Sequence, residues 1–314
     1  MNDKGRDTVK KFLLFFWNGF FTIKNKIKDF CYRIFDLFFV AFHNPPQVMT
    51  CEETMEYILK NGCSVTRYGD AEIKLAYGTD VCYQISTPEI QKRLQQVIGS
   101  CSDDFLVCIP NVFDEKGLSI LSDGHTSFWK KHLSYFRKYW YRDLNFDCVY
   151  GDAFISRHYM NLKDKETGLE EYFSLVKKLW EDKDIIIVEG EKSRLGMGND
   201  LFDNAKNVRR ILGPSAQCFS KYDELLEEVK SHGKAPLYIL ALGPSATIMA
   251  YDLCVAGYRA IDMGNIDTEY EWYKMKATHK MPIKDKMVYE AGAGAGVGDV
   301  DDPEYLSQII AKIC

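Results

Sequence analysis

The sequence predicts an α/β protein with a Rossmann-like, mostly parallel sheet, flanking helices and an N-terminal amphipathic helical arm. Short apolar runs that suit buried strands alternate along the chain with amphipathic segments that suit helices. Five of these runs end in a cluster of polar residues. Because the carboxyl ends of parallel strands meet at one sheet edge, such clusters predict a single site there.

Composition limits the class of protein. The 314 residues are 46% hydrophobic and 27% charged, as in an ordinary folded chain. A net charge of −5 argues against nucleic-acid binding, which requires a basic face. None of the ten cysteines forms a C-x-x-C pair. We interpret them as reduced, buried thiols of a cytosolic protein, and not as a disulfide framework or a zinc site.

The first 46 residues differ from the rest and predict a membrane-associating arm, with the folded domain over 47–314. The apolar, aromatic run 12–23 is only 12 residues long, short of the roughly 20 that span a bilayer. Aromatic residues with interspersed lysines over 10–42 suit helices lying in the membrane interface. We expect peripheral attachment to the inner face of the cell membrane. The alternative is a helix packed on the protein's own core or on a second subunit.

Within the domain, each strand is predicted from an apolar run and each helix from amphipathic spacing and capping residues. Thr50, for example, is a suitable N-cap with acids in the turn that follows. The predicted strands are 64–68, 105–109, 147–150, 184–188, 237–242 and 259–263. The predicted helices are 50–59, 73–77, 88–98, 128–141, 171–180, 222–230, 245–256 and 303–313.

The clearest unit runs from 235 to 272, as strand, turn, helix and strand. Gly243 in its turn allows a phosphate to approach the backbone, and the helix start offers free N–H groups. Ser245 is the expected N-cap and Gly257 the expected C-terminal glycine. An ordinary turn that binds nothing is the alternative. The same L-G-P-S-A string also occurs at 212–216, where we predict no preceding strand and interpret the repeat as coincidence.

Two D-x-E strings follow strands, Asp267 with Glu269 and Asp70 with Glu72. Paired carboxylates suit a divalent cation, although a solvated turn produces the same spacing. Arg67 precedes the second string, and can bind a ligand or merely pair with these acids.

The polar loop after strand 184–188 contains Lys192, Ser193 and Arg194, which can grip a diphosphate, and glycines that permit close approach. Neither the P-loop order nor G-x-G-x-x-G is present, which disfavours ATP hydrolysis and dinucleotide binding. The glycine-rich stretch 291–298 is interpreted as a linker, with a mobile lid as the alternative.

Taken together, the strings RYGDAE, GDAFISR, VEGEKSRLGMGNDLF, LGPSAT and DMGNIDTEYEW resemble the GT-D fold glycosyltransferases. These bacterial enzymes of glycan and glycoprotein assembly were formerly grouped as a domain of unknown function. The likeness covers roughly 48–272 in order. It implies a Rossmann-like domain, a UDP-sugar donor and a divalent cation, Mn²⁺ or alternatively Mg²⁺, bound through a D-x-E string.

On this resemblance we assign the metal to Asp267 and Glu269, which follow the nucleotide-type unit, with Asp70 and Glu72 as second choice. Asp70 or Glu72 is otherwise the expected catalytic base. The chain has Asn265 where family members commonly have histidine. The residues expected to bind the nucleotide sugar are Arg67, Gly69, Asp152, Arg157, Glu189, Lys192, Ser193, Arg194, Gly196, Gly243, Pro244, Ser245, Ala246 and Thr247.

The predicted function is therefore a metal-dependent hexosyltransferase acting on a glycan, lipid-linked glycan or glycoprotein. A different polysaccharide-modifying transferase, such as a pyruvyl transferase using phosphoenolpyruvate, is one alternative. A catalytically inactive membrane-bound scaffold is the other. The donor sugar, the linkage, the stereochemistry and the oligomeric state stay open at this point.

Overall fold

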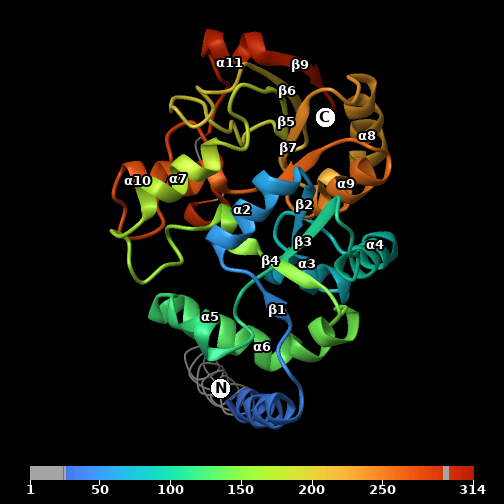
Figure 1. Ribbon diagram of the computed structural model, residues 1–314, viewed down its shortest axis with the longest axis vertical. Helices are drawn as coiled ribbons and strands as arrows, with labels where there is room; N and C mark the ends of the chain where they lie inside the picture. Colours follow the sequence, from blue (N-terminus) through green and yellow to red (C-terminus); the bar gives the residue numbers. More distant parts are fainter. Residues whose placement is uncertain (1–23, 25, 293–296) are drawn as a thin grey trace, which may run out of the picture.

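A computed structural model describes residues 24, 26–292 and 297–314 of the protein. Within them lies a nine-stranded sheet, parallel throughout, in the order β1-β4-β3-β2-β8-β7-β5-β6-β9 (Figure 1). The strands are β1 (Gln47–Val48), β2 (Ser64–Arg67), β3 (Phe105–Ile109), β4 (Val149–Asp152), β5 (Asp184–Gly190), β6 (Asn207–Gly213), β7 (Leu237–Ala241), β8 (Ala260–Asp262) and β9 (Ile309–Lys312). This confirms the predicted α/β class.

Helices cover both faces of the sheet (Figure 1). On one face α8 and α4 pack against α9, which lies on β2 and β8, while α2 and α7 pack together on the other. The helices are α2 (Cys51–Asn61), α3 (Asp70–Ala76), α4 (Pro88–Ile98), α5 (Glu115–Ser119), α6 (Asp123–Asp143), α7 (Leu169–Lys177), α8 (Tyr222–Ser231), α9 (Pro244–Val255), α10 (Ile266–Lys274) and α11 (Pro303–Gln308). The domain also contains three short 3₁₀ turns, η1 (Ala153–Ser156), η2 (Cys218–Lys221) and η3 (Tyr289–Ala291).

The six predicted strands are all present, and the apolar run of β5 is fully buried between its neighbours β7 and β6. Thr50 caps α2 as expected, in a capping box with Glu53. Gly257 follows Ala256, the C-cap of α9, with φ of 79°, as expected for a C-terminal glycine. The local signals that placed these elements were therefore sufficient.

Three strands, β1, β6 and β9, were not predicted. The interpretation of the L-G-P-S-A repeat as coincidence is wrong, because β6 ends at Gly213 and places this string at a strand end as well. Two arginines interrupt the apolar pattern of β6, and one of them, Arg210, is buried by an ion pair with Glu189 of β5 at 2.7 Å. The predicted helix 303–313 is also partly wrong: α11 ends at Gln308, and the chain continues as β9 beside β6.

Two further expectations are corrected. Gly243, with φ of 56°, is the N-cap of α9, and Ser245 lies buried in the first turn. Cys101 and Cys148 form a disulfide, whereas we expected reduced thiols. These two cysteines precede β3 and β4, and the pairing of these neighbouring strands brings them together without any sequence motif. Four free cysteines, at positions 51, 63, 108 and 218, are buried as expected, whereas those at positions 31, 82 and 314 are exposed.

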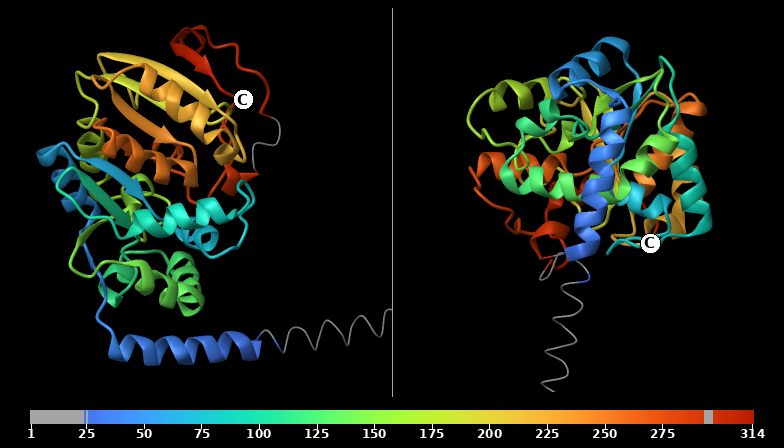
Figure 2. Two further views of the ribbon diagram at one scale, coloured as in Figure 1. Left: turned by 90° about the vertical axis from the view of Figure 1, so that its right-hand side faces the viewer. Right: turned by 90° about the horizontal axis from the view of Figure 1, so that it is seen from below.

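The described part of the N-terminal arm is a helix over 26–42, which we call the arm helix. It lies along one end of the molecule, beside α6 (Figure 2). Among the described residues, no helix combines the length and apolar character needed to span a membrane. The run 12–23 and residues 293–296 of the stretch 291–298 lie outside the described residues, so the predictions for them stand as made.

Candidate functional site

A cavity of about 820 Å³ opens at the carboxyl edge of the sheet. Its wall includes residues at or just after the ends of successive strands, namely Arg67, Pro110, Ala153, Gly190, Pro214, Ala241 and Asp262. In the sheet, β2 and β8 are neighbours. After β2 the chain continues to β3 on the side of β2 away from β8, and after β8 it continues to β9 at the far edge on the other side. The cavity thus lies at a topological switch point, the usual ligand position in open α/β sheets.

The structure brings part of the predicted set into this cavity. The lining contains Arg67, Gly69, Asp70, Glu72, Arg157, Ser193, Gly243, Pro244 and Asp267. It does not contain Asp152, Glu189, Lys192, Arg194, Gly196, Ser245, Ala246, Thr247 or Glu269. Residues that are adjacent in sequence therefore differ in position: Ser193 lines the cavity, for example, whereas Lys192 and Arg194 do not.

Several residues outside the lining have partners that explain their positions. The buried Glu189 carboxylate pairs with Arg210 and accepts a hydrogen bond from the backbone of Leu195. Arg194 donates to the carbonyl oxygens of Asp285 at 2.8 Å and Gly298 at 2.6 Å. These contacts fix the loop after β5 and the segment packed against it. Glu189 and Arg194 therefore hold this loop in place without lining the cavity.

The last residues of β2 and β8 connect the two halves of the sheet. The Arg67 guanidinium donates to a carboxylate oxygen and to the carbonyl oxygen of Asp262, both at 2.8 Å. Gly264 lies next to it with φ of 38°, which favours glycine, and a Cβ there would lie 2.0 Å from the Arg67 Nη2 atom and displace the guanidinium. Arg67 is consequently held in one orientation at the floor of the cavity.

Asp70 and Glu72 begin α3 and face the cavity. The Glu72 Oε2 atom accepts a hydrogen bond from the backbone N–H of Gly69 at 2.7 Å, and Asp70 pairs with Lys74 at 2.6 Å. Burial raises the pKa of Glu72 to about 7, with the nearby carboxylates of Asp262 and Asp70 adding to the shift against the Gly69 N–H. A carboxylate that titrates near neutral pH is suited to accept a proton in a reaction.

Asp267 and Glu269 lie in the first turn of α10 and engage different parts of the protein. Asp267 forms an ion pair with Lys286 at 2.8 Å in which each side chain is 3% exposed, and it also accepts from the Gly196 N–H. Glu269 is fully buried and accepts from the backbone of Met160 at 2.7 Å. The two carboxylates are therefore committed to different partners.

This geometry bears on where a divalent cation fits. Among the described residues, no three His, Cys, Asp or Glu side chains meet as a metal cage. Asp70 and Glu72 offer carboxylate oxygens to the cavity, and such cations commonly combine one or two carboxylates with phosphate and water ligands. The charge of Asp267 is already balanced by Lys286. The α3 acids therefore fit a substrate-bound cation better than the α10 acids.

One wall of the cavity comes from residues that the sequence did not single out. Glu290 forms an ion pair with Arg157 at 2.7 Å and accepts from Asn265 at 3.2 Å. Burial opposes the ionisation of Glu290, but Arg157 outweighs it and lowers the pKa to about 2. The neighbouring Tyr289 contacts the ring of Tyr83 with centroids 4.9 Å apart. No spacing or motif connects these positions, which lie far apart in the sequence.

The start of α9 also lines the cavity, beside Tyr83. Gly243 has φ of 56°, and a Cβ there would lie 3.4 Å from the Tyr83 ring. Ser193 and Ser215, from the loops after β5 and β6, line the same region. The first turn of a helix presents unpaired N–H groups and the positive end of its dipole, which favour an anion. Both L-G-P-S-A strings therefore contribute to this end of the cavity.

Comparison with known proteins gives a consistent result. The family model for glycosyltransferases of the GT-D fold matches residues 65–291. The chain is 39% identical over 267 residues to a probable glycosyl transferase, Gly, of Streptococcus gordonii. It is 37% identical over 268 residues to the glycosyltransferase GlyD of Streptococcus pneumoniae serotype 4. Each match covers 85% of this chain, but the chain spans only 39% and 32% of the two relatives.

Solved structures agree with the sequence matches. One, described as a highly conserved domain of unknown function 1792 with a distinct glycosyltransferase fold, is 38% identical with a TM-score of 0.82. That match covers 86% of this chain and 96% of the other. A second, described as a new glycosyltransferase from Streptococcus sanguinis, is 39% identical with a TM-score of 0.82 and covers 86% and 100%.

Proposed function

Because the chain belongs to the family of GT-D fold glycosyltransferases, we propose that it transfers a hexose from a UDP-sugar to an acceptor hydroxyl, assisted by a divalent cation. The observation that supports this most is the cavity at the switch point. It combines the start of α9, which favours an anion, with a carboxylate, Glu72, whose pKa lies at about 7. Inverting sugar transfer from a nucleotide uses both features.

In this proposal the diphosphate of UDP binds at the start of α9, beside Gly243 and Ser193. The backbone N–H groups of the first helical turn donate to the phosphate oxygens. The aromatic pair Tyr83 and Tyr289 stands at the same end and offers a face against which a planar base can stack.

We propose that Asp70 holds the cation together with the diphosphate. The assignment to Asp267 and Glu269 is the alternative, and the ion pair of Asp267 with Lys286 argues against it. When bound, the cation supplies Lewis-acid stabilisation of the negative charge that develops on the departing UDP. The residues of this chain then have to orient the sugar, exclude water and remove one proton.

Glu72 is the proposed base. In an inverting transfer, the acceptor oxygen forms a bond to the anomeric carbon while the bond from that carbon to the diphosphate oxygen breaks. The electron pair of the broken bond leaves with UDP, and the acceptor proton passes to Glu72. Its pKa of about 7 leaves a large share of the side chain ionised at neutral pH and still basic enough to take that proton.

We propose a lipid-linked glycan as the acceptor, with a free glycan or a glycoprotein as alternatives. The support for this choice is that one helix, α6, contacts both the cavity and the arm helix. Phe128 of α6 lines the cavity, and Lys131, one turn further, pairs with Asp29 of the arm helix. An acceptor carried at a membrane surface near the arm helix would thus be close to the cavity.

The test is calorimetric titration with UDP, with and without Mn²⁺, on the full chain and on two matched variants. We expect Mn²⁺ to strengthen UDP binding in the full chain and in Asp267→Asn/Glu269→Gln. The effect of Mn²⁺ should be lost in Asp70→Asn, which removes one charge without changing the size of the side chain.

The other outcomes are equally informative. Mn²⁺ dependence that survives in Asp70→Asn and disappears in the α10 variant would return the metal to Asp267 and Glu269. If Glu72→Gln abolishes it as well, both α3 acids ligate the cation and the base must be sought elsewhere. No binding of UDP under any of these conditions would overturn the UDP-sugar proposal and favour another transferase or a scaffold.

A further inference from the structure

The arm helix presents an unusually apolar outer face. Eight large apolar side chains on it are between 39% and 82% exposed: Ile27, Phe30, Ile34, Phe35, Leu37, Phe38, Val40 and Phe42. We call this set the outer face. Contiguous exposed patches of this kind mark interaction sites in soluble proteins.

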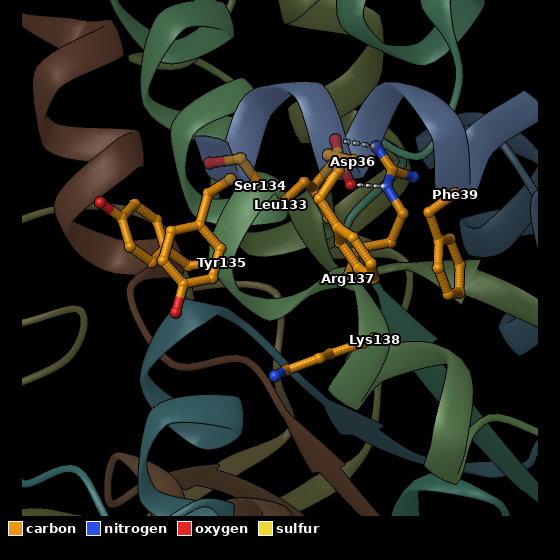
Figure 3. Close-up of a pocket in the computed structure, with 9 residues that line it drawn as sticks. Asp36, Phe39, Leu133, Ser134, Tyr135, Arg137 and Lys138 are labelled. Carbon is orange, nitrogen blue, oxygen red and sulfur yellow. Dashed lines mark hydrogen bonds and ion pairs between the residues drawn. The ribbon is translucent and has the colours of Figure 1, made fainter. Parts of the chain in front are cut away.

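The opposite side of the same helix is committed to the protein body. Asp29, Tyr32, Asp36 and Phe39 repeat at intervals of three and four residues and are the half-buried positions of the helix. Asp36 forms an ion pair with Arg137 of α6 at 2.7 Å (Figure 3). Such a repeat is typical of one helix packed along another.

Other contacts along this repeat fix the orientation of the arm helix. Tyr32 lies against Tyr135 of α6 with ring centroids 4.4 Å apart, and Phe39 meets Tyr141 edge-on at 5.1 Å. A small cavity of about 30 Å³ lies between the arm helix and α6 (Figure 3). Phe35 lies at the edge of the outer face and also lines this cavity. These contacts hold the helix so that the outer face stays exposed to solvent.

Charge is divided between the two sides in the same way. The two acids between residues 24 and 42, Asp29 and Asp36, both pair with α6. The basic residues Lys24, Lys26 and Arg33 are exposed. Outside its contact with α6, the arm helix thus combines large apolar side chains with positive charge and has no acid among its described residues.

We propose that the outer face seats the protein on a bilayer surface that contains anionic lipid. Apolar and aromatic side chains enter the interface, while lysines and arginine contact the lipid headgroups, as in helices that lie in the plane of a membrane. The sequence before the described arm helix extends the same chemistry, with an apolar, aromatic run at 12–23 preceded by Lys10 and Lys11. This combination favours a lipid surface over a second copy of the chain.

This docking also orients the enzyme. The arm helix and the cavity share α6, with Phe128 in the cavity wall and Lys131 at the arm only three residues apart. That separation is about 4.5 Å along a helix axis. The docked domain therefore holds its cavity close to the lipid headgroups. The docking itself does not depend on the proposed glycosyl transfer.

Vesicle flotation with the full chain tests the proposal. We expect flotation with vesicles of mixed phosphatidylglycerol and phosphatidylcholine, and much weaker flotation with phosphatidylcholine alone. The variant Phe30→Ser/Leu37→Ser should lower the fraction bound by ~10- to 100-fold, because both side chains leave the apolar face. Lys24→Gln/Lys26→Gln should weaken binding less and reduce its sensitivity to salt.

The matched control is Val255→Ser/Leu306→Ser, which removes two exposed apolar residues on α9 and α11. It should float like the full chain. Equal flotation of the arm variant, or no flotation of the full chain with phosphatidylglycerol, would overturn the proposal. So would a dimer in solution that the arm variant dissociates, since the outer face would then bind a second copy. UDP titration of the arm variant keeps this test separate from the proposed transfer.

Discussion

The two D-x-E pairs have the same spacing and both follow a strand, yet the fold gives them different surroundings. Asp70 and Glu72 start α3 at the cavity, where Asp70 has only a partly exposed lysine as partner. Asp267 and Glu269 start α10 and are both buried, and Asp267 is neutralised by the buried Lys286. The comparison shows that the D-x-E spacing alone does not determine what the two acids do. Their burial and their ion-pair partners determine it.

The physical reason is desolvation. A carboxylate buried without solvent must be paired or hydrogen-bonded, and its charge is then no longer available to a ligand. At the cavity, a carboxylate keeps oxygens that can meet a substrate or a cation. We therefore expect substitutions of the α3 acids to impair activity and substitutions of the α10 acids to impair stability.

The largest effect is expected for Glu72→Gln. Loss of the proposed base should reduce kcat by ~10²- to 10⁴-fold, because general base catalysis typically contributes that much. The matched variant Glu269→Gln should leave kcat within a few-fold of the unaltered chain. Sugar transfer to an acceptor, measured at saturating donor, checks both. An equal loss of kcat in Glu269→Gln would show that the two D-x-E pairs do not differ in the way we infer.

A large change of stability is expected for Asp267→Ala. It leaves the buried Lys286 ammonium with Glu271, at 3.0 Å, as its remaining carboxylate partner, which should lower the free energy of unfolding by ~1–3 kcal/mol. Asp70→Ala removes only a partly exposed pair with Lys74 and should cost about 1 kcal/mol or less. Urea unfolding of both variants gives the two values. Similar losses would show that the two acids do not differ in the way we infer.

The pH dependence sharpens the assignment of Glu72. Since its pKa is about 7, kcat/KM should rise with pH up to about 7, and Glu72→Gln should remove this rise. The free energy of unfolding, in contrast to kcat/KM, should fall as the pH rises through this range. Relative to the ordinary value of 4.5, the raised pKa means that the folded state holds the proton more tightly. This contribution is complete below pH 4.5 and is lost as pH rises through about 7. Urea unfolding at several pH values checks it.

The smallest effect is expected at the wall formed by Glu290. In its ion pair with Arg157, the Arg157 side chain is 31% exposed and the Glu290 side chain is 26% exposed. Glu290→Gln should therefore lower the free energy of unfolding by about 1 kcal/mol or less. UDP affinity should change by only about 2- to 5-fold, since this substitution frees Arg157 without removing a ligand. With its pKa lowered to about 2, Glu290 stabilises the fold above pH 4.5, and this is lost as pH falls towards 2.

Several features were predictable because they depend on residues close together in the chain. The apolar run of β5, the capping box at Thr50 and the glycine turn at Gly243 all follow from local propensity and hydrogen bonding. The convergence of polar strand ends followed from the parallel sheet alone. Expected cavity residues such as Arg67 and Glu72 were found for this reason.

Other features were hidden because their signal lies in distant parts of the chain. β6 was missed since Arg210 looks polar in sequence and is buried only by pairing with Glu189 of the adjacent strand. The wall of Tyr83, Tyr289 and Glu290 joins segments that no spacing connects. Cys101 and Cys148 meet for the same reason, at the start of two neighbouring strands.

The sequence by itself determined the α/β class, the carboxyl edge as the site and the family resemblance, because periodicity and strand-end motifs are local properties of the chain. Only the tertiary structure decided which of the acids at the cavity is paired with a buried cation. Lys286 lies outside the resemblance at 48–272, and its burial against Asp267 separates the two D-x-E pairs. Burial and charge pairing depend on contacts between distant residues, and these exist only once the sheet and its helices have packed.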